Sequence, residues 1–412
     1  MNASTPQPAA PYPKLRWYQP TPGRLLLVLL AVEGVLLLSE RFLWFPFNEK
    51  KGWTVLIAIE SVIAAMMLML LWWVFALLFR WRFQFSIRSL LVLTIAVAIP
   101  FSWLAVEMKR AKEQRAAVEA IQELEGRVYP SEPSSPEPGV KQYTEYRFSE
   151  EPEWLRSTLG DEFFAPVACV FLDDTHVSDA DLLQVGGLRN LRELVLTGTR
   201  VTDAGLAHLE GLSQLKVLEL NNTAITDAGL KHLQGLLQLQ SLNLSSTSVT
   251  DTGMEYLGHL VQLRELELLH VNVGDAGLKH LKCLTQLHEL CLYTRQVTDA
   301  GMEHVKALNQ LHVLTLEDTA VTDAGLRHLQ GMRQLEVLWL NGAPISGVGL
   351  EYLEGLSQLR TLVLTGTQVT DAGLVHLQGL SQLKGLYLSG TKVTDEGVKK
   401  LQQALPNCTI HR

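Results

Sequence analysis

Residues Val201–Ala224 read V-T-D-A-G-L-A-H-L-E-G-L-S-Q-L-K-V-L-E-L-N-N-T-A, and this stretch decides the fold because the chain repeats it every 24 residues. A fixed period of this length is typical of a solenoid, in which each repeat is one supersecondary unit stacked on the next. Such arrays usually present a surface, so the pattern favours a binding scaffold over an enzyme. Further copies begin at Val177, Ile225, Val249, Val273, Val297, Val321, Ile345, Val369 and Val393.

Two hydrophobic patterns divide each repeat. The frame L-x-x-L-x-L-x-x-T, seen from Leu215 to Thr223, alternates apolar and polar positions, which predicts a short strand with one buried face. Ahead of it, Leu206, Leu209 and Leu212 fall three apart, which predicts a short helix with one apolar side. Each repeat is therefore expected to run strand, turn, helix, turn.

Polar residues and glycines are expected to bound the helix. Thr202 and Asp203 offer N-capping oxygens and a negative charge at its positive end. The Asp recurs in nearly every repeat, but one carboxylate per repeat falls short of the about six to eight oxygens that calcium takes, so capping is predicted. Gly211 stands where a helix end favours a residue tolerant of positive φ. The same place holds Gly187, Gly235, Gly331, Gly355 and Gly379.

The unit V-T-D-A-G-L with its strand frame resembles the leucine-rich repeat, most closely the ribonuclease-inhibitor-like and cysteine-containing subclasses. The resemblance implies an α/β solenoid, a horseshoe of about eleven parallel strands over residues 165–412, preceded by a helical transmembrane region. Thr223 and its equivalents are expected to satisfy backbone groups of the turn. Val271, Arg295 and Ala343 break this threonine column, and irregular structure is expected near 271–295 and 341–348.

The front of the chain differs in charge and hydropathy. Residues 1–128 carry a formal charge of +5 and the remainder −13, which indicates two regions with different surroundings. Trp53–Phe79 and Ser89–Val106 are long enough to cross a bilayer, and Leu25–Leu38 is a third span if Phe42–Phe47 extends it. The predicted organisation is a disordered tail (1–24), two to three transmembrane helices (25–107), a juxtamembrane helix, Pro-rich linker and N-terminal cap (108–164), and the repeats (165–412).

The stretch F-S-I-R-S-L-L from Phe85 to Leu91 and the basic segment that follows resemble the anchor of bacterial membrane-tethered leucine-rich repeat proteins. This resemblance implies an anchor without an activity. The compact basic cluster Arg80–Arg88 favours the cytoplasmic side, which places the repeats outside the cytoplasm. Glu33 and Glu60 lie inside apolar runs, where a protonated Glu bonding a neighbouring helix is expected, with oligomerisation through these helices.

Catalytic and metal chemistry lacks the necessary residues. His208 and its equivalents form a column that could bind metal, but no Cys or carboxylate column lies at ligand spacing, so no metal or cofactor is predicted. The four cysteines do not form a disulfide framework, because Cys169 and Cys291 lie five strands apart and Cys283, at a helix end, points differently from Cys291 on a strand. The chain contains no G-x-S-x-G, H-E-x-x-H or phosphate-binding glycine loop, so no enzyme is predicted.

The candidate binding residues lie between the buried leucines of the strands, on the expected concave face. Acidic and aromatic side chains gather there, as in binding hot spots, and the acidity disfavours nucleic acid. We expect a protein or peptide ligand with basic character, or a glycan on the aromatic rings. A cytoplasmic adaptor similar to F-box-type leucine-rich repeat proteins, or an inhibitor of the ribonuclease-inhibitor type, stays open. The predicted site comprises Glu219, Glu265, Glu267, Glu289, Cys291, Tyr293, Glu317, Trp339 and Tyr387.

Overall fold

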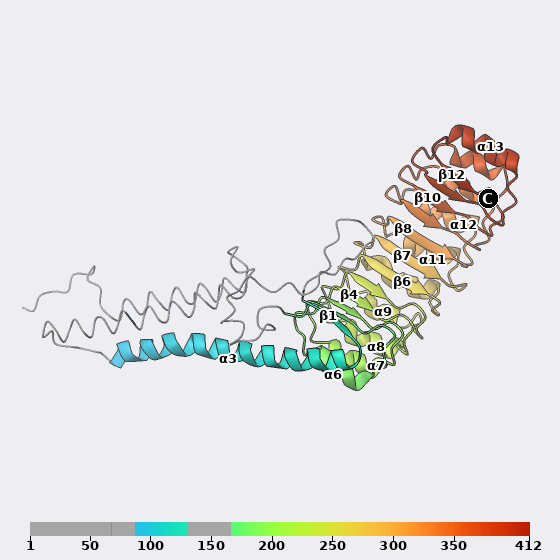
Figure 1. Cartoon of the computed structure of the whole chain (residues 1–412). Coiled ribbons are helices and arrows are strands. Elements are labelled where there is room, and N and C mark those ends of the chain that lie inside the picture. Colours follow the sequence, from blue (N-terminus) through green and yellow to red (C-terminus); the bar gives the residue numbers. More distant parts are fainter. Residues whose placement is uncertain (1–66, 68–86, 131–165) are drawn as a thin grey trace, which may run out of the picture. The chain divides into compact units, whose positions relative to one another are not determined.

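The computed structural model describes Met67 and residues 87–130 and 166–412 (Figure 1). The chain divides into two compact units, one of Met1–Ala111 with Phe148–Phe164 and the other of Lys112–Arg147 with Ala165–Arg412. Helix α3 (Ile87–Glu123) contains the predicted span Ser89–Val106. The predicted spans at 25–47 and 53–79, with Glu33 and Glu60, lie outside the described residues, as do the linker and the cap predicted within 131–164. No helix of the described part of the chain reaches the length and hydrophobicity that a membrane crossing requires.

Within the described residues the solenoid is a 12-stranded sheet whose strands follow one another in chain order (Figure 1). Eleven of these strands, β2 to β12, are parallel, as the repeat pattern predicts. They are β2 (Cys169–Phe171), β3 (Glu193–Val195), β4 (Val217–Glu219), β5 (Ser241–Asn243), β6 (Glu265–Leu269), β7 (Glu289–Tyr293), β8 (Val313–Glu317), β9 (Val337–Trp339), β10 (Thr361–Val363), β11 (Gly385–Tyr387) and β12 (Thr409–His411).

Short helices lie along the opposite side of the repeats from the open sheet face (Figure 1). Most are only one or two turns long because each 24-residue repeat must also contain a strand and the two connecting turns. The α-helices are α6 (Asp179–Gly186), α7 (Asp203–Leu206), α8 (Asp227–Leu230), α9 (Met254–Leu257), α10 (Asp275–Leu278), α11 (Asp299–Val305), α12 (Asp323–Leu326) and α13 (Asp395–Ala404). The 3₁₀ segments are η2 (Ala207–Leu209), η3 (Lys231–Leu233), η4 (Lys279–Cys283), η5 (Arg327–Leu329), η6 (Gly349–Leu353) and η7 (Gly373–Leu377).

The core is a continuous column of leucines. Each repeat contributes the apolar positions of the strand frame and of the helix, and these side chains are almost fully buried, as at Leu206, Leu218 and Leu220. Full burial of one such side chain stabilises the fold by about 1.5–3 kcal/mol. The two hydrophobic patterns read from the sequence therefore describe one core, shared between neighbouring repeats.

The N-terminal end of this core is closed by the end of α3 and by a strand that the sequence did not predict. Ala117 and Ile121 of α3 are buried in the leucine core. Strand β1 (Arg127–Tyr129) then pairs antiparallel with β2, so the first repeat strand is not an open edge. The antiparallel pairing could not be read from the repeat, because residues 108–130 share none of its pattern.

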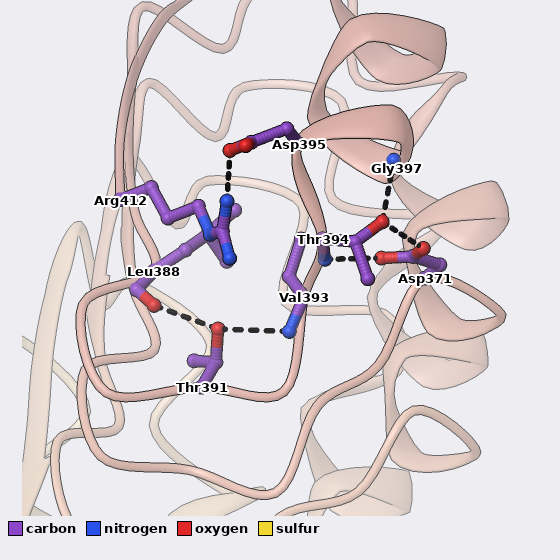
Figure 2. Close-up of polar contacts among 8 residues, drawn as sticks. All are labelled: Asp371, Leu388, Thr391, Val393, Thr394, Asp395, Gly397 and Arg412. Carbon is purple, nitrogen blue, oxygen red and sulfur yellow. Dashed lines mark hydrogen bonds and ion pairs between the residues drawn. The ribbon is translucent and has the colours of Figure 1, made fainter.

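The regularly spaced aspartates place a negative charge in the first turn of their helices, as predicted, but their oxygens do not cap that turn. Thr202 caps its helix, as expected, by accepting a hydrogen bond from the backbone N–H of Ala204. Asp203 instead bonds the next repeat: its Oδ1 accepts from the backbone N–H of Thr226 at 2.8 Å and its Oδ2 from the Thr226 hydroxyl at 2.6 Å. We call this arrangement the inter-repeat clamp, and Figure 2 shows the copy formed by Asp371 and Thr394.

The clamp recurs with little variation along the solenoid. The backbone bond measures 2.7–2.8 Å and the hydroxyl bond 2.5–2.7 Å. Asp251 faces Gly274, which offers only a backbone N–H. At Gly347 the carboxylate is missing. The other clamps pair Asp179 with Thr202, Asp203 with Thr226, Asp227 with Thr250, Asp275 with Thr298, Asp299 with Thr322, Asp323 with Ser346 and Asp371 with Thr394.

The position that requires positive φ was predicted wrongly. Of the glycines at helix ends, Gly331 has positive φ, at 102°, whereas Gly187 is right-handed with φ −73°. A left-handed residue instead follows nine of the eleven parallel strands, all but β7 and β12, at the point where the chain leaves the sheet. This residue is glycine in four repeats and Asp, Asn, Ser or His in the other five, and Asn, Asp and His are the side chains most often found in that region. These residues are Asp174, Gly198, Asn222, Ser246, His270, Asp318, Gly342, Gly366 and Gly390.

The threonine column bonds the turn as expected. The hydroxyl of Thr199 donates to the carbonyl of Leu196 at 2.7 Å, and Thr223, Thr247, Thr319, Thr367 and Thr391 repeat this bond. Figure 2 shows the Thr391 bond to Leu388. Where the column is broken, Val271 and Ala343 bury apolar side chains in its place. The repeats differ from the others near both stretches where irregular structure was predicted. Near 271–295 the strands β6–β8 are five residues long instead of three, and near 341–348 Gly347 replaces the aspartate of the clamp.

Candidate functional site

The exposed side of the sheet is built by strand alternation. In each three-residue strand the middle apolar residue points into the core, and in the five-residue strands β6–β8 the second and fourth residues do so, which leaves the alternate residues pointing away from the core. We call this side of β2–β12 the sheet face. All nine residues predicted as a binding site lie on strands β4–β9 and β11, and each is on the sheet face as the alternation requires.

Four of the predicted glutamates are near one another on β4, β6 and β7. Glu265 and Glu289 are direct Cα partners on adjacent strands, and Glu267 lies one level further along β6. Glu219 lies two strands away at the level of Glu267, with Asn243 between them. The Asn243 amide donates to Oε2 of Glu267 at 2.8 Å and fixes that carboxyl. We call Glu219, Glu265, Glu267 and Glu289 the acidic cluster.

The acidic cluster is electrostatically unfavourable for its own members. Partial burial raises the pKa of Glu267, and the negative charges of Glu219, Glu289 and Glu265 raise this pKa further. Burial and the charge of Glu265 likewise raise the pKa of Glu289. A cation placed among these carboxylates would relieve that repulsion, so the cluster is complementary to a basic ligand.

Cys291 sits next to the cluster as a protonated thiol. It is the Cα partner of Glu267 on one side and of Thr315 on the other. Burial, with the charges of Glu289 and Glu267, raises the pKa of the Cys291 thiol to about 12. Since the thiolate is the nucleophile and the metal ligand, this environment suits a packing role and not catalysis.

Tyr293 and Glu317 form a separate group. The Tyr293 hydroxyl donates to Oδ2 of Asp318 at 2.7 Å, and its ring contacts the His270 ring at a centroid distance of 4.1 Å. Glu317, the Cα partner of Tyr293, accepts from the Asn341 amide at 3.2 Å. The sequence grouped Tyr293 with Trp339 and Tyr387, but the structure places it one level further along the strand direction than the register of those two rings.

Trp339 and Tyr387 are the exposed aromatic residues of the sheet face. Trp339 is 39% exposed and Tyr387 is 38% exposed, while Val363 on the strand between them is 6% exposed. Tyr387 stacks on the ring of His411 with centroids 4.5 Å apart and planes at 11°. The acidic cluster on β4, β6 and β7 and this aromatic pair on β9 and β11 thus lie on the same face, on either side of β8.

Several contributing residues were missed from the sequence. Asn243 and His411 occupy sheet-face positions of the strand frame, and applying the frame to every repeat would have found them. Asp318 and His270 lie in the left-handed turn after the strand, a position that periodicity alone did not mark as special. A stacked pair, His288 and His312, with centroids 5.1 Å apart, also escaped notice.

Two histidines of the helix column, His232 and His376, each contact a glutamate of the preceding repeat. Nδ1 of His232 lies 2.5 Å from Oε1 of Glu210, and Nδ1 of His376 lies 2.6 Å from Oε1 of Glu354. Burial lowers the pKa of His304 and His328. Across residues 87–130 and 166–412, no group of three or more His, Cys, Asp or Glu side chains is arranged to hold a metal ion. The four cysteines, all within the described residues, are free.

Family models agree with the repeat architecture. One leucine-rich repeat model matches residues 189–249 and a second matches residues 382–401. Among solved structures, an internalin from Listeria monocytogenes is 21% identical, with a TM-score of 0.38, over 59% of this chain and 86% of the internalin. A leucine-rich repeat protein from Leptospira interrogans is 20% identical, with a TM-score of 0.40, over 56% of this chain and 68% of its own. No curated protein matches the chain.

The repeats, the parallel sheet and the family models together define the class. The chain contains leucine-rich repeats, and a domain built of such repeats commonly serves as a protein-binding module. Such domains are typically not enzymes, which fits the protonated Cys291 and the inter-repeat role of the aspartates.

Proposed function

We propose that this chain is a membrane-anchored binding module whose sheet face captures a partner protein with basic character. The observation that carries the proposal is the composition of that face, an acidic cluster on β4–β7 followed by two exposed rings on β9 and β11. Exposed aromatic residues beside charge are typical of binding hot spots. The unit V-T-D-A-G-L supports the ribonuclease-inhibitor-like or cysteine-containing subclass.

Support for the anchor comes from the sequence. The apolar run at 53–79 has the length that a spanning helix needs, and the basic cluster at 80–88 favours the cytoplasmic side. The proposed topology puts the repeats outside the cytoplasm. Protease treatment of intact cells, with antibody detection of the repeats, tests this topology. Digestion in intact cells, or after only an outer envelope is opened, supports it. Protection until the inner membrane is broken would instead favour a cytoplasmic adaptor.

Capture of the partner by the full chain tests the binding surface. The double variant Trp339→Ala with Glu267→Lys removes the exposed ring and reverses one charge of the acidic cluster. Both side chains lie on the sheet face, outside the leucine core, so the melting temperature should not fall below that of the parent chain. We expect the double variant to lose capture from an extract of the source cells. A matched control, Glu396→Lys on α13, reverses an exposed charge away from the sheet face. Retained capture by the double variant would contradict the proposal.

A further inference from the structure

One row of side chains crosses six strands of the sheet face at a single register level. Each residue is the Cα partner of the next, from β6 to β11, so the backbone register alone places these residues side by side. Its chemistry changes in one direction, from carboxylate through thiol and hydroxyl to aromatic. We call it the register row, and it contains Glu267, Cys291, Thr315, Trp339, Val363 and Tyr387.

The aromatic end of the register row is built to receive an apolar group. Trp339 and Tyr387 are two strand spacings apart, about 10 Å, with the nearly buried Val363 between them. The rings of Tyr387 and His411, on the adjacent strands β11 and β12, are stacked with centroids 4.5 Å apart, close to the spacing of two strands. The plane of the Tyr387 ring is therefore roughly perpendicular to the direction in which the strands are stacked. The other face of Tyr387 is therefore directed toward β10.

Gly385 makes room for this ring. A Cβ atom at residue 385 would lie 3.4 Å from Cε2 of Tyr387, which shows that the ring leans over the glycine on its own strand. An apolar side chain placed over Val363 would contact the free face of Tyr387 and the side chain of Trp339. Within the register row Thr315 and Val363 are each less than 9% exposed, so the row itself offers no exposed polar group between Trp339 and Tyr387 to bond sugar hydroxyls. This composition favours an apolar side chain over a glycan.

We infer that the register row binds an extended peptide segment of the partner, with a Lys or Arg side chain at Glu267 and a large apolar or aromatic side chain over Val363. From β6 to β10 is four strand spacings, about 19 Å, and an extended chain covers this distance with about six residues. This inference rests on the proposed function. It adds the chemistry of the ligand and the spacing of its two anchoring side chains.

A peptide array read with the purified full chain tests the spacing. The probes are Gly/Ser peptides that carry one arginine and one tryptophan, in both orders, separated by two to ten residues. We expect the signal to peak at a separation of about six and to fall at both extremes. Glu267→Lys should abolish the dependence on arginine, and Trp339→Ala should abolish the dependence on tryptophan, each with a loss of about tenfold, the factor that corresponds to about 1.4 kcal/mol.

The control and the outcomes separate this inference from the proposed function. Glu396→Lys should leave the array signal unchanged, and circular dichroism of each variant should match the parent. A signal that is independent of separation, dependence on only one of the two side chains, or no signal at any separation would each overturn the inference. The preceding capture experiment uses the natural partner, so the proposed function can survive when the extended-peptide inference fails.

Discussion

The inter-repeat clamp should carry a measurable part of the stability of the solenoid, and Asp227→Ala removes one copy of it. The Asp227 carboxylate accepts two hydrogen bonds from Thr250, one from the backbone N–H at 2.7 Å and one from the hydroxyl at 2.6 Å. Both partners are part-buried. Its Oδ1 also occupies the space beside Gly253, where a Cβ atom would lie 2.4 Å from it.

The expected loss of stability follows from the two hydrogen bonds that the charged Asp227 carboxylate accepts. Hydrogen bonds to charged groups contribute about 1.5–3 kcal/mol each, and partial solvent access at this site favours the lower end for each bond. We therefore expect Asp227→Ala to lower the free energy of unfolding by about 2–3 kcal/mol. Asp227→Asn keeps an acceptor for the backbone N–H and should cost about half as much, roughly the value of one neutral bond, 1 kcal/mol.

A double-mutant cycle of Asp227→Ala and Thr250→Val, measured by urea unfolding of the full chain, isolates the hydroxyl bond. We expect a coupling energy of about 1 kcal/mol between the two positions. The chain supplies its own control, because Thr370 faces Gly347 and has no carboxylate opposite it. Thr370→Val should therefore cost less than Thr250→Val. A cost for Asp227→Ala below about 0.5 kcal/mol, or equal costs for the two threonines, would refute the clamp.

Three further outcomes follow from the same geometry. Glu267→Gln should raise the melting temperature at pH 7. The pKa of Glu267 is raised in the folded chain, so the parent chain loses stability as pH rises from the ordinary carboxyl pKa of 4.5 through the folded pKa, and the gain from the substitution should vanish below that window. Native Cys291 should react with a maleimide at pH 8 more slowly than the exposed Cys283, because its pKa is raised to about 12, whereas equal rates would contradict this environment. Gly366→Ala should cost about 1–2 kcal/mol in urea unfolding, because φ is +72° there and the nearest atom to an added Cβ is at 3.7 Å, so backbone strain acts without a clash. Gly355→Ala, at a glycine without positive φ, is its control and should be nearly neutral.

The repeat determined the fold because one unit cannot bury its apolar face alone and must stack on its neighbours. Leu218 and Leu220 alternate with polar residues, and Leu206 and Leu209 fall three apart, so the strand, the helix and the shared core follow from hydrophobic period alone. The same alternation placed Glu267 and Trp339 on the open face. Eleven parallel strands were therefore predictable from residue order.

Tertiary structure decided which residues of neighbouring repeats contact each other. The aspartates read as helix caps because sequence shows only local neighbours, whereas stacking brings Asp203 within 2.8 Å of the Thr226 amide, 23 residues away. Register placed Trp339 and Tyr387 level with Glu267 and moved Tyr293 to another level, where Asp318 binds it. The closing strand β1 lies outside the repeat, so no periodic pattern could predict it. Local patterns fix each unit, and contacts between units set the surface available for binding.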